Sequence, residues 1–144
     1  MTIGGTYDDA NIFAKILRGE LPCVKVYDDA DVLAFMDLYP QARGHTLVLP
    51  RNVRARNFLD FPPERIAPLL LQVQRIARAV NTALSPDGIS ILQFNGAPAG
   101  QTVFHLHFHI LPRYEGVKLA GHGHGQRAEL AELVALAKQI ADAM

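Results

Sequence analysis

The chain of 144 residues contains a single cysteine, Cys23, and no tryptophan. One cysteine cannot form an intramolecular disulfide, and it excludes a zinc site built mainly from cysteine. The formal net charge is zero with neutral histidines, a poor electrostatic footprint for a nucleic-acid-binding protein. No apolar run reaches the roughly 20 residues that a membrane-spanning helix needs, and residues 1–9 lack the pattern of a secretory signal. We therefore expect a single cytoplasmic domain over residues 1–144, with no membrane or nucleic-acid partner.

A run of alternating histidine and apolar residues occupies positions 103–113. Successive side chains of a β-strand point to opposite faces, whereas a helix would scatter residues of this spacing. The run predicts a strand with three histidines on one face. Those histidines are His105, His107 and His109, and the other face carries Phe104, Leu106, Phe108 and Ile110. A half-buried strand with a merely polar face also fits the pattern, but histidine favours a chemical role, because it is a common base, nucleophile and metal ligand.

Periodicity and short connections predict one α+β domain. Residues 1–8 contain two glycines and few apolar residues, so we expect a loose start. Pro68 lies within a long helical stripe, where it predicts a kink or a regular helix that begins near it. We expect an antiparallel five-stranded sheet with flanking helices, packed on the face opposite the histidines. The predicted elements are a helix over 11–18, strands over 24–27, 32–36, 45–50, 89–94 and 103–113, a helix over about 61–84, and a C-terminal helix over 126–144.

A tight loop over residues 95–101 directly precedes the histidines. Backbone N–H groups of Gly96, Gly100, Gln101 and Thr102 are placed to converge on an anion, because glycine lets a backbone approach closely. A neutral imidazole can attack phosphorus, and a second imidazole can donate a proton to the leaving group. The layout therefore suits phosphoryl or nucleotidyl transfer without a metal.

Metal binding is the competing interpretation. Two histidines at i and i+2 of a strand can hold zinc, and His45 could complete the site. A hydrolytic zinc site also needs an open position and usually a nearby base. Residues 89–113 contain no carboxylate, although Asp37 or Glu115 could approach through folding. The pattern favours metal-free chemistry.

Two further clusters are ambiguous in the sequence. His122 and His124 alternate with glycines and could lend a metal ligand, but a loop without chemistry is favoured, because glycine fixes them poorly. Arg51, Arg54 and Arg56 could form an anion-binding patch, but a solvated loop and helix end is the favoured interpretation.

Residues 100–113 resemble the signature of the histidine triad (HIT) superfamily, His-φ-His-φ-His-φ-φ, where φ is apolar. Residues 12–16, 33–37 and 40–50 resemble the Hint branch of this family. Residues 99–103 and 111–113 are more similar to the dinucleoside-polyphosphate-hydrolase (Fhit) branch. The resemblance covers roughly residues 11–113.

The resemblance implies a role for each histidine. His107 would be the nucleophile that becomes nucleotidylated, and His109 would contact phosphate and assist the leaving group. His105 would support the triad, and His45 would lie behind it. Asp37 would bind ribose hydroxyls.

The resemblance also implies a hydrolase or transferase acting at the α-phosphate of a purine nucleotide conjugate, either a phosphoramidate or a dinucleoside polyphosphate. It implies no required cofactor, and a homodimer whose sheets join into one. From spacing alone, the apolar residues could be plain core. The implied phosphate loop is Asn95, Gly100, Gln101 and Thr102, and the implied base pocket is Ile12, Phe13, Ile16, Phe35 and Leu38.

The sequence departs from the family pattern in two further respects. Some relatives hold structural zinc through a Cys-x-x-Cys pair in the first helix, where this chain has Asn11 and Ala14, so we expect no metal. The tryptophan-bearing tail of the Hint branch has no counterpart, which removes one contribution to substrate choice. A nucleotide sensor without turnover and a histidine metal-binding protein are the alternative functions.

Overall fold

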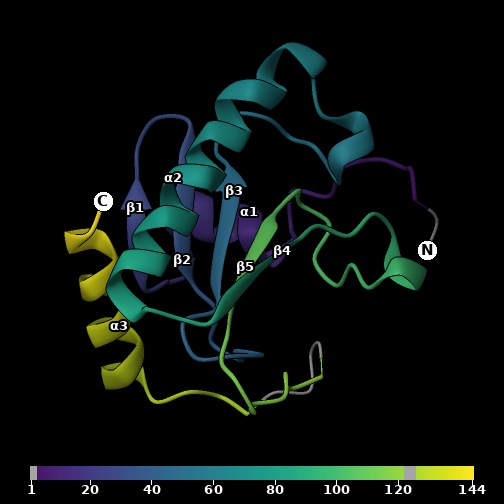
Figure 1. Ribbon diagram of the computed structural model, residues 1–144. Coiled ribbons are helices and arrows are strands. Elements are labelled where there is room, and N and C mark those ends of the chain that lie inside the picture. Colours follow the sequence, from purple (N-terminus) through teal and green to yellow (C-terminus); the bar gives the residue numbers. More distant parts are fainter. Residues whose placement is uncertain (1–2, 122–125) are drawn as a thin grey trace.

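The computed structural model describes residues 3–121 and 126–144 (Figure 1). The sheet has five strands in the order β1-β2-β3-β5-β4, and every neighbouring pair is antiparallel. The predicted α+β fold is therefore confirmed. The helices and strands are α1 (Ile12–Leu17), β1 (Lys25–Asp28), β2 (Val32–Met36), β3 (Thr46–Pro50), α2 (Ile66–Leu84), β4 (Gly88–Leu92), β5 (Phe108–Arg113) and α3 (Leu130–Asp142), with 3-10 turns at Phe58–Asp60, Pro63–Arg65 and Ala97–Ala99.

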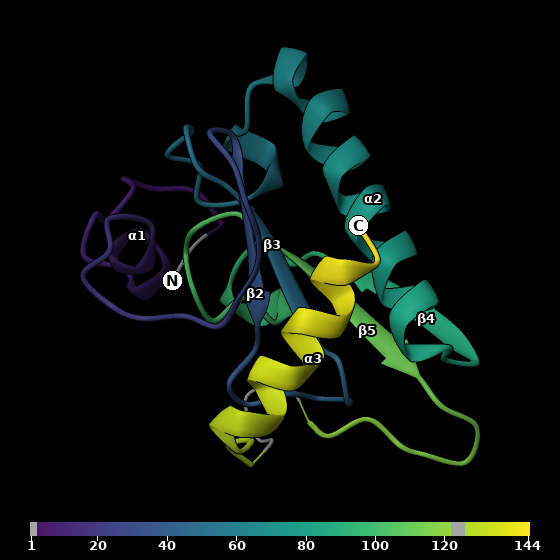
Figure 2. The same ribbon diagram turned by 90° about the vertical axis from the view of Figure 1, so that its left-hand side faces the viewer.

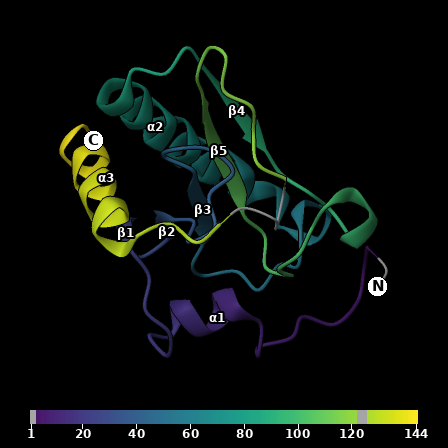
Figure 3. The same cartoon turned by 90° about the horizontal axis from the view of Figure 1, so that it is seen from below.

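Helices cover both faces of the sheet, which corrects the expectation that they pack on one face. Helices α2 and α3 lie on one side, and α1 lies on the other (Figures 2 and 3). Strand β2 is buried along its whole length. Its residues Val32, Ala34 and Met36 belong to the core beneath α2 and α3, whereas Leu33 and Phe35 pack with Phe13 of α1. Both sets are apolar, so both faces need a helix to exclude water.

Helix α2 resolves the ambiguity at Pro68. The regular helix begins at Ile66 after a 3-10 turn, so Pro68 lies in its first turn. The first N–H groups of a helix have no partner within the helix, and proline is therefore tolerated there. The second of the two predicted alternatives is confirmed. The buried stripe of α2 consists of Leu69, Val73, Ile76, Ala77, Ala79 and Val80.

The chain ends differ from their predicted form. Helix α3 begins at Leu130 rather than near residue 126. The segment from Ile3 was expected to be loose, but side chains of the loop after β3 hold it. Asn57 Nδ2 donates to the Ile3 carbonyl at 2.8 Å, and Arg56 Nη1 donates to the Thr6 carbonyl at 3.1 Å. Within the described ranges, no helix combines the length and apolarity that crossing a membrane needs.

The predicted histidine strand is shorter than expected. Strand β5 begins at Phe108, so His109 lies within it, while His105 and His107 precede it. The Leu106 N–H donates to the Ala55 carbonyl at 2.8 Å instead of to a neighbouring strand of the sheet. The 93–107 connection is therefore longer than a tight loop. The expectation that all three histidines share one face of a strand is wrong.

Candidate active site

A cavity of about 320 Å³ opens on the α1 side of the sheet. It has an apolar end at α1 and a polar end at β5. Every residue of the predicted base pocket lines it, together with Asp37, Thr102, His107 and His109. The sequence prediction missed part of the wall. The lining residues are Ile12, Phe13, Ile16, Pro22, Cys23, Phe35, Met36, Asp37, Leu38, Tyr39, Gln41, Leu47, Thr102, Val103, His107 and His109.

Strand pairing places His109 on β5, an inner strand of the sheet. It pairs with Leu47 of β3 on one side and Leu92 of β4 on the other. Side chains opposite one another in an antiparallel pair point to the same face, so His109 shares the α1 face with Leu47. Its Nδ1 lies 2.9 Å from Nε2 of His45, and both imidazoles are buried.

A backbone N–H determines which nitrogen of His45 carries the proton. The Gln41 N–H donates to Nδ1 of His45 at 3.1 Å. A backbone N–H is only a donor, so Nδ1 accepts and Nε2 of His45 carries the proton. That proton is donated to Nδ1 of His109, and neutral His109 therefore carries its own proton on Nε2.

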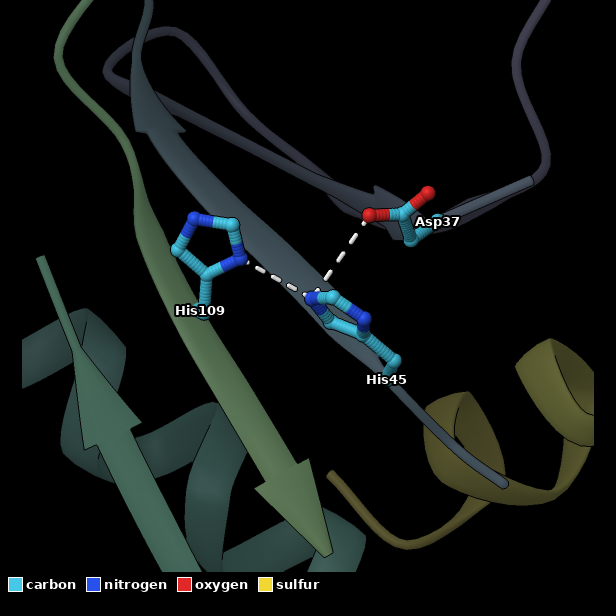
Figure 4. Close-up of side chains that lie close together, drawn as sticks. All are labelled: Asp37, His45 and His109. Carbon is cyan, nitrogen blue, oxygen red and sulfur yellow. Dashed lines mark hydrogen bonds and ion pairs between the residues drawn. The ribbon is translucent and has the colours of Figure 1, made fainter. Parts of the chain in front are cut away.

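Asp37 is the third member of this network (Figure 4). Its Oδ2 lies 3.6 Å from Nε2 of His45, and its backbone N–H donates to the His45 carbonyl at 3.1 Å. Its Oδ1 accepts from the Tyr39 N–H at 2.8 Å. Asp37 thus reaches the cavity from the end of β2 in a fixed orientation.

The spacing of Asp37, His45 and His109 also suits a metal, because their ligand atoms all lie within 4.8 Å of one another. Coordination through Nε2 of His45 needs an unprotonated nitrogen. The Gln41 N–H at Nδ1 favours the opposite tautomer, with the proton on Nε2. The cluster is therefore better suited to passing hydrogen bonds than to holding a cation. His122 and His124 lie outside the described residues, and the absence of a metal stays a prediction.

His107 presents the complementary tautomer. Its Nδ1 lies 2.6 Å from the His105 carbonyl, which only accepts, so Nδ1 carries the proton. The lone pair of neutral His107 is therefore on Nε2. The ring of Phe13 packs edge-on against it, with centroids 4.8 Å apart, and the His109 ring lies at 5.0 Å. The cavity thus contains one imidazole with a lone pair on Nε2 beside one with an Nε2 proton.

His105 does not line the cavity. Its Nε2 lies 2.9 Å from the Pro50 carbonyl, and its Nδ1 lies 2.5 Å from the Tyr7 hydroxyl. Burial lowers the pKa of His105 below its usual value, and the bond to the Pro50 carbonyl opposes this only in part. His105 is therefore neutral at physiological pH.

Most N–H groups of the predicted anion-binding loop form hydrogen bonds within the loop itself. The N–H of Gly96 donates to the Gln101 side chain at 2.8 Å, and the Gln101 N–H donates back to the Gly96 carbonyl at 3.1 Å. The Gly100 N–H donates to the Ala97 carbonyl. These bonds stabilise the 3-10 turn, so three of the four expected donors are used within the loop. Thr102 is the member that lines the cavity.

The side chains of Asn95 and Gln101 hold the loop to the segment after β3. Asn95 Oδ1 accepts from the Phe58 N–H at 2.9 Å, and Gln101 Nε2 donates to the Arg56 carbonyl at 2.6 Å. Neither residue lines the cavity. Both side chains therefore stabilise the position of the loop.

The arginine cluster is divided by the fold. Arg51 pairs with Asp28, and Arg54 pairs with Asp9 at 3.3 Å. Arg56 is 3% exposed and lies over the Phe104 ring, 4.9 Å from its centroid. Because Arg56 is buried, both sequence interpretations, an anion-binding patch and a solvated loop, are wrong for this residue.

Cys23 lies in the cavity wall. Burial raises the pKa of its thiol, which disfavours the reactive thiolate.

Comparison with known proteins agrees with this fold. The HIT domain family model matches residues 18–116. The crystal structure of a Hit-like protein from Bartonella henselae is 48% identical, covers 97% of this chain and 100% of that chain, and superposes with a TM-score of 0.90. The adenosine 5′-monophosphoramidase hnt1 of Schizosaccharomyces pombe is 39% identical over 102 residues, or 71% of this chain and 73% of that protein. The adenylylsulfatase HINT3 of Arabidopsis thaliana is 39% identical over 104 residues, or 72% of this chain and 52% of that protein.

The fold is that of a histidine triad protein. The chain belongs to the HIT family.

Proposed function

We propose that the chain is a hydrolase or transferase that acts at the α-phosphate of a purine nucleotide conjugate through a nucleotidyl-histidine intermediate. The observation that carries this proposal is the pair of opposite tautomers in the cavity. The His105 carbonyl places the lone pair of His107 on Nε2, while the Gln41–His45 relay places a proton on Nε2 of His109. A nucleophile and a hydrogen-bond donor thus stand side by side, which is the pair that the proposed nucleotidyl transfer needs.

In the proposed reaction, Nε2 of His107 forms a bond to the α-phosphorus. The bond from phosphorus to the leaving group breaks, and the leaving group keeps the electron pair. Positive charge develops on the His107 ring, which strengthens the Nδ1–H bond to the His105 carbonyl. A departing nucleotide oxygen or a phosphoryl oxygen accepts from Nε2–H of His109. A departing amine leaves as the neutral molecule, because its nitrogen takes up a proton from solvent before the bond breaks. Water then attacks the phosphorus of the nucleotidyl-histidine, the bond from phosphorus to Nε2 of His107 breaks, and the ring keeps that electron pair. One water proton passes to solvent, and the nucleoside monophosphate is released.

The rest of the cavity suits a nucleoside. Ile12, Phe13, Ile16 and Phe35 form an apolar end that fits a purine, and Ile12 is 50% exposed although it lies in this wall. Asp37 lines the same cavity next to His45, and we propose that its carboxylate accepts from ribose hydroxyls. The proposed reaction uses only side chains and water, so we propose that it requires no cofactor.

The leaving group is proposed to be an amine or a nucleotide. Two relatives are named as an adenosine 5′-monophosphoramidase and an adenylylsulfatase, which supports an adenylyl conjugate as the substrate class. The mixed Hint-like and Fhit-like sequence features leave both leaving groups within the proposal.

The test is turnover of adenosine 5′-phosphoramidate, run in parallel with a diadenosine polyphosphate. His107→Ala should abolish turnover and the covalent adenylyl adduct seen by mass spectrometry, while the Kd for AMP changes little. Equal turnover in both proteins would refute the His107 mechanism. Tight AMP binding without turnover or adduct in wild type would instead support the nucleotide-sensor alternative.

We also propose a homodimer that pairs along β4. Both β1 and β4 are edges of the sheet. Strand β1 carries a Lys25–Asp28 ion pair and a pairing irregularity, features that protect an edge from association. Strand β4 carries Ile91, which is 48% exposed. Sedimentation should give a dimer, and Ile91→Lys should favour the monomer.

A further inference from the structure

The N-terminal segment Ile3–Tyr7 lies against the histidine loop. Asn57 and Arg56 hold its carbonyls at Ile3 and Thr6. A Cβ added at Gly96 of the loop would lie 3.5 Å from Ile3 Cα, so the segment and the loop are in close contact. These contacts bring the half-buried ring of Tyr7 beside the triad.

Tyr7 and Pro50 hold the His105 ring from its two nitrogens. The Pro50 carbonyl only accepts, so Nε2 of His105 carries the proton and Nδ1 accepts from the Tyr7 hydroxyl at 2.5 Å. Burial raises the pKa of Tyr7, so its hydroxyl keeps the proton that it donates. The Tyr7 and His105 rings also meet edge-on, with centroids 5.7 Å apart.

The main chain of His105 holds the proposed nucleophile. Its carbonyl accepts the Nδ1 proton of His107 at 2.6 Å. The ring and the carbonyl belong to one residue, so a ring held at both nitrogens limits how far that carbonyl can turn. Tyr7 itself does not line the cavity.

We propose that Tyr7 is a positioning residue for His107. Its hydroxyl fixes the His105 ring and, through the His105 carbonyl, the ring orientation and tautomer of His107. The kinetic consequence rests on the function proposed above, whereas the tautomeric consequence does not.

Tyr7→Phe removes only the hydroxyl oxygen. Nδ1 of His105 then loses its Tyr7 donor at a buried position, where an acceptor without a partner is unfavourable. The His105 ring and carbonyl become less restricted, and a smaller fraction of His107 keeps its productive orientation. We expect kcat for adenosine 5′-phosphoramidate to fall about tenfold, an effect equivalent to about 1.4 kcal/mol in the barrier. KM and the Kd for AMP should change less than about twofold, because Tyr7 does not touch the cavity.

Tyr27→Phe is the matched control. It removes another half-buried hydroxyl, which donates to the Asp29 carboxylate at 2.6 Å beside β1 and does not contact the cavity. The second readout is ¹⁵N NMR of the histidine side chains, which reports the protonated nitrogen of each ring. Tyr7→Phe should shift the His105 Nδ1 and His107 Nδ1 signals, and Tyr27→Phe should leave both unchanged.

The two readouts separate the two proposals. Wild-type kcat with an unchanged His107 Nδ1 signal in Tyr7→Phe would overturn the positioning role, as would an equal loss of kcat in Tyr27→Phe. If wild type turns over neither conjugate, the proposed function fails, but the NMR result still decides. A shifted His107 signal in Tyr7→Phe then supports positioning, and an unshifted one overturns it.

Discussion

Gly44 immediately precedes His45, and replacing it with alanine tests how tightly the fold surrounds the histidine relay. Its φ is +92°, a conformation that residues with a Cβ rarely adopt. An added Cβ would lie 2.4 Å from Leu84 Cδ1 and 3.1 Å from Pro112 Cγ. Leu84 can move its flexible end, but Pro112 is a ring within β5 and has little freedom.

These two effects set the expected magnitude for Gly44→Ala. A left-handed backbone costs about 1–2 kcal/mol for a residue with a Cβ. Overpacking a filled site typically costs a further 1–3 kcal/mol or so. Reduced freedom of the unfolded chain returns roughly 0.4–1 kcal/mol. We therefore expect the free energy of unfolding to fall by about 3 kcal/mol, a large share of the roughly 5–15 kcal/mol typical of a domain.

Two other glycines provide matched controls. Gly19 has φ +78° with nothing within 4 Å of an added Cβ, and Gly4 has open space without the unusual φ. Gly19→Ala should therefore show the backbone effect alone, and Gly4→Ala should be nearly neutral. Urea unfolding followed by far-ultraviolet circular dichroism measures all three variants, since the chain has no tryptophan. The steric reasoning is refuted if Gly44→Ala costs no more than Gly19→Ala.

The remaining predictions concern acid stability and base binding. Burial lowers the pKa of His105 in the folded chain, so the unfolded chain binds more protons below the ordinary histidine pKa of 6.5. The stability that neutral His105 contributes is fully present above that pH and is lost as the pH falls toward its folded pKa. The loss is at most about 1.4 kcal/mol per pH unit, and His105→Gln should unfold with a smaller pH slope in urea titrations. Equal slopes would contradict this account. Ile12→Ser should weaken AMP binding about fivefold with little change in stability, because half of this side chain is already exposed. Unchanged calorimetric affinity would exclude Ile12 from the base pocket.

Local pattern was sufficient to predict most of the elements. The apolar run of β2 and the start of α2 near Pro68 both depend on residues a few positions apart, and the structure contains both. The prediction that helices pack on one face of the sheet failed at the same strand. Both the odd-numbered and the even-numbered residues of β2 are apolar, and sequence alone cannot say which helix covers which set. The alternation of histidines similarly predicted too long a strand at β5, because Leu106 bonds to Ala55, a residue far away in the chain.

Residue identity by itself determined which chemistry is available here: three histidines two positions apart, and apolar residues suited to a base. Only the tertiary structure decided which nitrogen carries each proton. The partners that do so are the carbonyls of His105 and Pro50 and the N–H of Gln41. Every residue type offers the carbonyl, and every type except proline offers the N–H. Sequence carries no signal for such backbone groups, because their position depends on the path of the whole chain. Tyr7 was missed for the same reason, since its hydroxyl reaches His105 only after the fold brings together residues 98 positions apart.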